Sequence, residues 1–162
     1  MKWPAPPSEM LRAGLIYGSG DLLGSLIQGG FSPGRALGMS LIGALLYAPE
    51  IHCYFAWIDR YGQPPTRYAQ RWQRAALAWA WFNPLWIARH CLFIRCLSGR
   101  VDEIGWNLLA VGTTAFLLNM PVALLANYLI QNRLPLRWRV LGSASFSAIM
   151  AVYYAMSEVW FG

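Results

Sequence analysis

Five ionisable side chains lie inside long apolar runs of this sequence: Asp21, Glu50, His52, Arg89 and His90. An ionised group in apolar surroundings is costly unless it is paired, so these positions carry most of the chemical information. Two carboxylates and one guanidinium could form a buried network, with Arg89 as the shared donor. Such a network would either tie helices together or line a polar pathway. We favour the structural role, because the charges are too few for a proton relay.

The sequence shows no pattern typical of an enzyme. It has no Ser/His/Asp order, no glycine-rich phosphate loop and no histidine cluster. The segment Gly18-Ser19-Gly20-Asp21 lies in an apolar run with no preceding strand, so it does not indicate nucleotide binding. His52 and His90 are the only histidines. A two-histidine haem site between helices stays open as an alternative, although we expect no cofactor and no catalytic residue.

The three cysteines do not indicate a metal site. They have no metal-ligand spacing, and an odd number cannot form a complete disulfide framework. Each lies in an apolar run, where a free thiol packs as a small hydrophobic group. The cysteines are Cys53, Cys91 and Cys96.

The amino-acid composition indicates whether water or lipid surrounds the segments that carry these residues. Of the 162 residues, 57% are hydrophobic and only 12% are charged. A soluble domain has about 25% charged residues. This chain has too few charges to cover a water-facing surface, so we expect lipid to surround much of it.

Five apolar segments are long enough to cross a bilayer, which takes about 20 mostly apolar residues. Turn residues or charges separate them, and no connection is long enough to hold a second domain. We therefore predict an all-α, polytopic transmembrane bundle of about five spans, forming a single domain over residues 1–162. The predicted spans are residues 11–29, 37–58, 75–97, 107–131 and 139–160.

The basic residues support an odd number of spans. With five spans, one side holds Lys2, Arg12, Arg60, Arg67, Arg71, Arg74, Arg133, Arg137 and Arg139, whereas the other holds Arg35, Arg95 and Arg100. This bias predicts that the N-terminus lies on the cytoplasmic or matrix-like side. The net charge of +6 is therefore attributed to membrane flanks and anionic lipid, not to nucleic-acid binding.

Small residues predict where the helices pack closely. Gly14 and Gly18, and likewise Gly20 and Gly24, lie four apart in the first span, which allows close backbone contact. The last span carries a stripe of alanines at helical spacing. These are Ala144, Ala148, Ala151 and Ala155.

Residues 47–59 of the second predicted span read YAPEIHCYFAWID. This segment resembles the Mpv/PMP family of mitochondrial and peroxisomal membrane proteins, which carries G-P-x-x-H-x-W-Y-x-x-L-D in its second span. Pro49, His52 and Asp59 match in register, and Gly43 falls where the family has a glycine.

Further blocks extend the resemblance over residues 11–157. Gly18, Gly20 and Asp21 match the first-span G-x-G-D, with Ser25 in place of a later glutamine. Ala78-Trp79 replaces an Asp-Gln pair and Met120 replaces a tryptophan, so the chain resembles a divergent member. The other matching positions are Pro84, Pro121, Asn127, Pro135, Arg139 and Tyr153.

The resemblance implies a small polytopic protein of the mitochondrial inner membrane, with a peroxisomal or other membrane as the alternative. Family members have been proposed to form channels for ions or small metabolites. We therefore expect a channel-like pore or its scaffold, with Asp21, Glu50, His52 and Arg89 as its internal polar residues. The expected partners are membrane lipids and further copies of the chain. The alternative is an accessory subunit of a larger complex, such as a respiratory or ATP synthase assembly.

Overall fold

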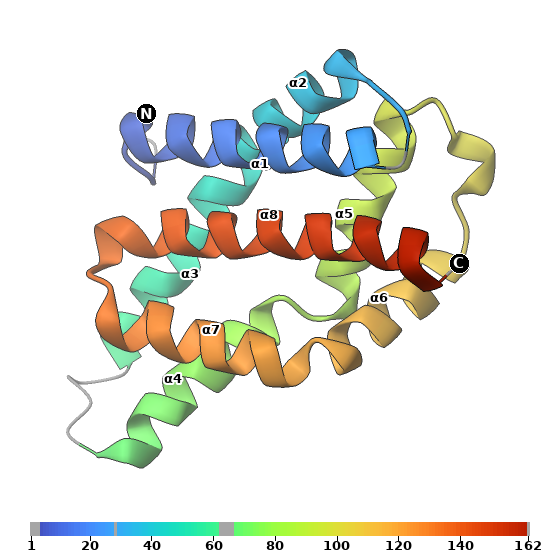
Figure 1. Cartoon of the computed structure of the whole chain (residues 1–162). Coiled ribbons are helices and arrows are strands. Elements are labelled where there is room, and N and C mark those ends of the chain that lie inside the picture. Colours follow the sequence, from blue (N-terminus) through green and yellow to red (C-terminus); the bar gives the residue numbers. More distant parts are fainter. Residues whose placement is uncertain (1–3, 28, 62–66, 162) are drawn as a thin grey trace. The chain divides into compact units, whose positions relative to one another are not determined.

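The computed structural model describes residues 4–27, 29–61 and 67–161, with the side chains of Tyr61 and of residues 151–161 excepted. Almost all of the described residues are helical and none forms a strand, so the all-α prediction is confirmed (Figure 1). The elements are α1 (Pro7–Ile27), α2 (Pro33–Ile42), the π-helical segment η1 (Gly43–Tyr47), α3 (Ala48–Tyr61), α4 (Tyr68–Trp81), α5 (Pro84–Leu97), the 3-10 turn η2 (Val101–Glu103), α6 (Asn107–Leu118), α7 (Met120–Arg133) and α8 (Leu136–Phe161).

The helices group into two compact units. The first holds Met1–Cys53 and Leu136–Gly162, and the second holds Tyr54–Pro135. Helix α3 begins in the first unit and ends in the second. The single domain predicted over residues 1–162 stays a prediction.

The helices lie on the five predicted apolar segments, but two of those segments are broken. Residues 75–97 fall on α4 and α5, and residues 107–131 fall on α6 and α7. Among the described residues, the continuous helix Pro33–Arg60 is long and apolar enough to cross a membrane, and the pair α6–α7, bent by 69°, is a second candidate if it counts as one span. At 1.5 Å per residue, the 28 residues of Pro33–Arg60 extend about 42 Å, more than the roughly 30 Å hydrocarbon core of a bilayer.

A π-helical turn lies just before Pro49 in this long helix. The amide of Ala48 donates to the carbonyl of Gly43, five residues back. Proline inside a helix removes one hydrogen bond and its ring crowds the carbonyl four residues earlier, so a wider turn before Pro49 relieves that crowding. The helix therefore continues through the proline of the family-like motif.

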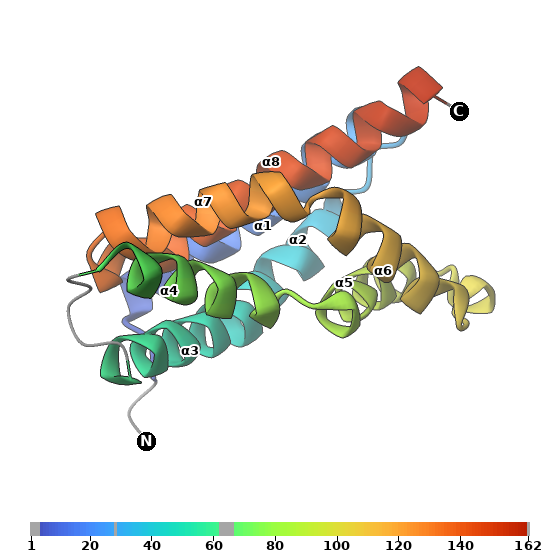
Figure 2. The same ribbon diagram turned by 90° about the horizontal axis from the view of Figure 1, so that it is seen from below.

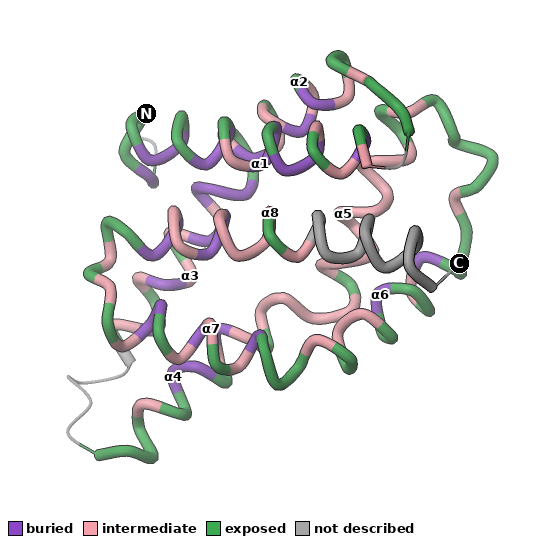
Figure 3. Tube along the Cα trace, viewed as in Figure 1, coloured by how far each residue is buried: buried purple, intermediate pink, exposed green. Residues whose placement is uncertain are grey.

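Helix α1 packs between two neighbours in the first unit. It contacts α2 and η1 on one side and α8 on another (Figures 1 and 2). A methyl group at Gly20 would lie 2.8 Å from Cβ of Ala148, and one at Gly43 would lie 2.8 Å from Cβ of Tyr17. Buried and exposed residues alternate along α1 accordingly (Figure 3).

The small-residue prediction is therefore confirmed at Gly14, Gly18, Gly20 and Ala148. Gly14 and Gly18 face Ser40 of α2. It is wrong at Gly24, where an added methyl group would meet no described atom within 4 Å. Ala144 is fully buried. The side chains of Ala151 and Ala155 lie outside the described residues.

In the second unit, α4 packs against α7 and α5 packs against α6. The α4–α5 break occurs at Asn83, whose side chain accepts hydrogen bonds from the amides of Leu85 and Trp86 at 3.0 and 3.1 Å. Pro84 and Pro121 each stand in the first turn of the following helix. Proline is tolerated there because the first amides of a helix have no partner within it.

Glycines in the left-handed region end two helices. Gly29 has φ 77° after α1, and Gly99 has φ 71° after α5. The amide of Gly30 donates to the carbonyl of Ser25, and the amide of Arg100 donates to the carbonyl of Arg95, both at 2.9 Å. This six-to-one bond is the Schellman arrangement, which reverses the chain after each helix.

Candidate functional site

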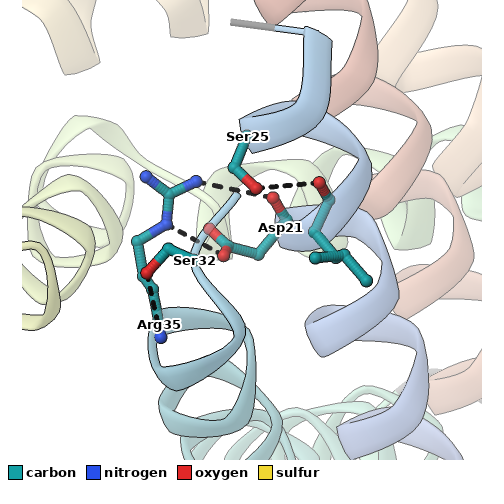
Figure 4. Close-up of polar contacts among 5 residues, drawn as sticks. Asp21, Ser25, Ser32 and Arg35 are labelled. Atoms are coloured by element: carbon teal, nitrogen blue, oxygen red, sulfur yellow. Dashed lines mark hydrogen bonds and ion pairs between the residues drawn. The ribbon is translucent and has the colours of Figure 1, made fainter. Parts of the chain in front are cut away.

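Asp21 on α1 forms an ion pair with Arg35 on α2. Arg35 Nε donates to Asp21 Oδ2 at 2.9 Å, and the two side chains are 11% and 5% exposed. The turn after α1 brings α2 back alongside it, so Arg35 points at Asp21 across the two helices (Figure 4). Ser25 lies beside the pair, and its hydroxyl donates to the carbonyl of Leu22.

His52 on α3 forms a second pair with Glu9 on α1. Nδ1 of His52 lies 3.2 and 3.1 Å from the two carboxylate oxygens of Glu9. Because a carboxylate accepts, Nδ1 carries the hydrogen in either charge state of the ring. The Glu9 side chain is 6% exposed, so this contact supplies a partner for an otherwise costly buried carboxylate.

Asp59 and Arg74 form a third pair, between α3 and α4 in the second unit. Arg74 is buried and Asp59 is partly exposed. Nη2 of Arg74 also donates to the carbonyl of Gln131 on α7 at 3.5 Å. Asp59, which matches the aspartate of the family motif, therefore pairs with Arg74, and Arg74 also contacts the last turn of α7.

A buried amide lies one turn before Gln131. Asn127 is 3% exposed, and its side-chain nitrogen donates to the carbonyl of Ala123 at 2.9 Å. Its Oδ1 has no hydrogen-bond partner among the described residues. Gln131 is 1% exposed. The carbonyl of Gln131 accepts from Arg74, and Asn127 lies four residues earlier on the same helix face.

The predicted network around Arg89 stays a prediction. Asp21, Glu50 and His52 lie in the first unit, whereas Arg89 lies in the second. The guanidinium of Arg89 lies 5.7 Å from the centre of the Trp86 ring. Glu50 is partly buried on α3.

The two histidines of the haem alternative have other contacts. His52 pairs with Glu9, and the His90 ring stacks on Trp86 with centres 5.9 Å apart. Among the described residues, no group of three His, Cys, Asp or Glu side chains is placed to hold a metal ion. The first test of that alternative is the absorption spectrum of the purified protein, where haem would give a Soret band.

Three of the remaining family-like positions lie at the start of a helix or on α8. Pro84 approaches α6, because a methyl group at Gly112 would lie 2.6 Å from its carbonyl. Pro135 directly precedes α8, and Arg139 is buried on α8. The side chain of Tyr153 lies outside the described residues.

Sequence reasoning missed Glu9, Arg35 and Arg74 as the partners of the expected residues. Arg35 could have been found, because a turn that folds two apolar helices together brings residues on either side of it into contact. Glu9 stands before the predicted start of the first span, and Arg74 stands before the third. Both looked like ordinary membrane flanks.

Comparison with known proteins adds no assignment: no protein-family model, no curated protein and no solved structure matches this chain.

Proposed function

We propose that this chain is an integral membrane protein of five spans, resembling the Mpv/PMP family, which serves as a channel-like pore or a membrane scaffold for ions or small metabolites. We place it in the mitochondrial inner membrane, with the peroxisomal membrane as the alternative. Its role is non-enzymatic.

The observation that carries this proposal is the inverted distribution of polar and apolar side chains. Glu9, Asp21 and Arg74 are only 6–8% exposed, whereas Leu118, Leu85 and Phe31 are 76%, 69% and 67% exposed. In water, charged side chains are almost never this buried unless paired, and large exposed apolar surfaces mark contact with another molecule or a membrane. The three buried charges are paired, so it is the exposed apolar surface that favours lipid around the helices.

The ion pairs favour a scaffold over a wide aqueous pore. The three pairs built on Asp21, Glu9 and Asp59 each join two helices: α1 to α2, α1 to α3, and α3 to α4. A carboxylate held by a neighbouring cation binds a permeating ion weakly. If a pathway exists, the amides of Asn127 and Gln131 are its best candidate lining, because amides interact with polar solutes without a charge barrier.

Alkaline carbonate washing of membranes that contain the full-length protein is the first test. We expect the protein to stay in the membrane pellet and to need detergent for release. Recovery in the supernatant would contradict the membrane proposal. Bilayer conductance of the purified protein then tests the pore: solute-dependent currents support it, and silent bilayers leave the scaffold.

An accessory-subunit role is the second candidate, and exposed aromatic side chains favour it. Trp106, Tyr68 and Trp72 are 89%, 77% and 48% exposed, and tryptophan and tyrosine are enriched at protein interfaces as well as at membrane interfaces. Native mass in a mild detergent separates the two candidates. A monomer or small homo-oligomer supports an autonomous protein, whereas co-migration with a large assembly supports a subunit.

A further inference from the structure

A basic-aromatic patch lies where α4 begins and α7 ends. It consists of Arg67, Tyr68, Arg71, Trp72 and Arg133. Both helices belong to the second unit and run side by side (Figures 1 and 2). The sequence places these arginines on the side that is richer in basic residues, but it does not bring Arg133 next to the start of α4.

Three contacts fix the two helices together at this end. The centres of the Trp72 and Tyr128 rings lie 4.6 Å apart. The side chain of Asn132 donates to the carbonyl of Arg71 at 3.1 Å. One turn further along α4, Arg74 reaches the carbonyl of Gln131. Arg133 directly follows Asn132 in the chain, so its backbone lies beside the basic first turns of α4.

The patch is open to its surroundings and has little acidic compensation. Arg67 and Arg133 are exposed, and Tyr68 and Trp72 are 77% and 48% exposed. The guanidinium of Arg71 lies 5.6 Å from the Tyr68 ring. Within the described parts of α3, α4 and α7 in this unit, Asp59 is the one acidic residue, and it pairs with Arg74.

This arrangement favours an anion. Arg67, the extended N-cap residue of α4, and Arg71 place two positive charges at the N-terminal end of the helix, where the helix dipole disfavours cations. An anion between them would offset these charges, and guanidinium groups bind phosphate oxygens through paired hydrogen bonds.

An apolar track leads away from the patch along each helix. On α7, Leu125 and Leu129 are 55% and 49% exposed and precede Arg133 at four-residue spacing, so the three share one face. On α4, the exposed residues Tyr68, Trp72 and Ala76 follow the same spacing. A free phosphate would use only the arginines, whereas a phospholipid would also cover these apolar faces.

We propose that the basic-aromatic patch is a binding site for the headgroup of an anionic phospholipid, whose acyl chains lie against the exposed faces of α4 and α7. This inference rests on the proposed membrane location. The arginines hold the phosphate, and Tyr68 and Trp72 mark the level of the membrane interface, where such rings are enriched.

Native mass spectrometry of the full-length protein in mild detergent tests the site, with phosphatidylglycerol or phosphatidylcholine added. We expect the wild-type protein to retain phosphatidylglycerol at least about tenfold more than phosphatidylcholine, a preference that should decrease as salt screens the charges. The double variant Arg67→Gln/Arg133→Gln should lose most of this preference. The control Arg100→Gln/Arg137→Gln removes the same charge from two other exposed arginines and should keep it.

Each other outcome overturns the inference in a distinguishable way. Equal retention of the two lipids, or equal loss in both double variants, means non-specific attraction. Displacement of the lipid by millimolar inorganic phosphate means a phosphate site.

Two controls accompany this test. Each variant should show the wild-type helix signal in circular dichroism, and the single variant Arg133→Lys should retain part of the lipid preference. If carbonate washing releases the protein, the membrane proposal itself fails; if the protein stays embedded without lipid preference, only the lipid site fails.

Discussion

At the scale of single residues, the main feature is that buried charges meet partners from neighbouring helices. Asp21 is the clearest case, because its side chain is 5% exposed and Arg35 is its ion-pair partner. Removing one partner of a buried pair leaves the other charge without compensation, which is more damaging than removing both. Both charges are therefore expected to be needed together at the α1–α2 contact.

We predict that Asp21→Ala destabilises the fold by about 3–5 kcal/mol, because the cation of Arg35 stays buried near α1. The measurement is the thermal unfolding of the purified protein in detergent. The double variant Asp21→Leu/Arg35→Leu should recover much of the loss, because it removes both charges. A double variant no more stable than Asp21→Ala would argue against the pair as the cause.

Asp21→Asn separates the structural role from a pore role. If Asp21 lines a pore, the amide should keep the fold and change the ion selectivity of reconstituted protein. If its role is structural, selectivity stays the same and stability falls. Unchanged stability together with unchanged conductance would contradict both roles.

At the scale of elements, the close approach of α1 and α8 depends on a glycine. A side chain at Gly20 would meet Ala148, whereas one at Gly24, a turn further along α1, would meet no described atom within 4 Å. The two glycines therefore form a matched pair, since they share one helix and differ in their surroundings.

We predict that Gly20→Ala destabilises the protein by about 1–3 kcal/mol, because the added methyl group forces α1 and α8 apart. Gly24→Ala should be neutral or stabilising by up to about 1 kcal/mol, because alanine favours helix and no described atom lies within 4 Å of the added methyl group. Unfolding midpoints of the two variants measured side by side check this. Equal effects would mean that the seam contributes little.

At the scale of the whole molecule, the open matter is how many of the helical segments cross the membrane. The bend of 69° between α6 and α7 suits either a broken span or a re-entrant segment. Irregular backbone at membrane depth is tolerated when it is covered by protein, so the bend alone does not exclude a crossing.

We predict that residues 102 and 137 lie on opposite sides of the membrane, because five spans put one crossing between them. Single cysteines at Asp102 and Arg137, in a variant whose native cysteines are replaced, can be labelled with an impermeant thiol reagent on sealed vesicles. Five spans require that only one of the two reacts from a given side. Reaction of both from the same side would make α6–α7 re-entrant and the five-span arrangement wrong.

The sequence by itself determined the all-α class and the positions of five apolar segments, but not the bend between α6 and α7 that divides one of them. Apolar run length, glycine turns and prolines are local signals, and they fix where a helix begins and ends without knowledge of its neighbours. The same local signals marked Asp21 and His52 as costly residues that needed partners, and Gly20 as a close-packing position.

Only the tertiary structure decided which residues pair with these buried charges. Glu9 lies 43 residues before His52, and Asn127 and Gln131 lie more than 50 residues after Arg74, so their proximity depends on which helices pack together. Arg89 was the predicted partner because it lies inside an apolar run, and its network stays a prediction, whereas the structure pairs Asp21 with Arg35. The cost of burying a charge can be seen in the sequence, because the charge stands in an apolar run. The partner that compensates it is distant in the chain, so it can be found only once the packing of the helices is known.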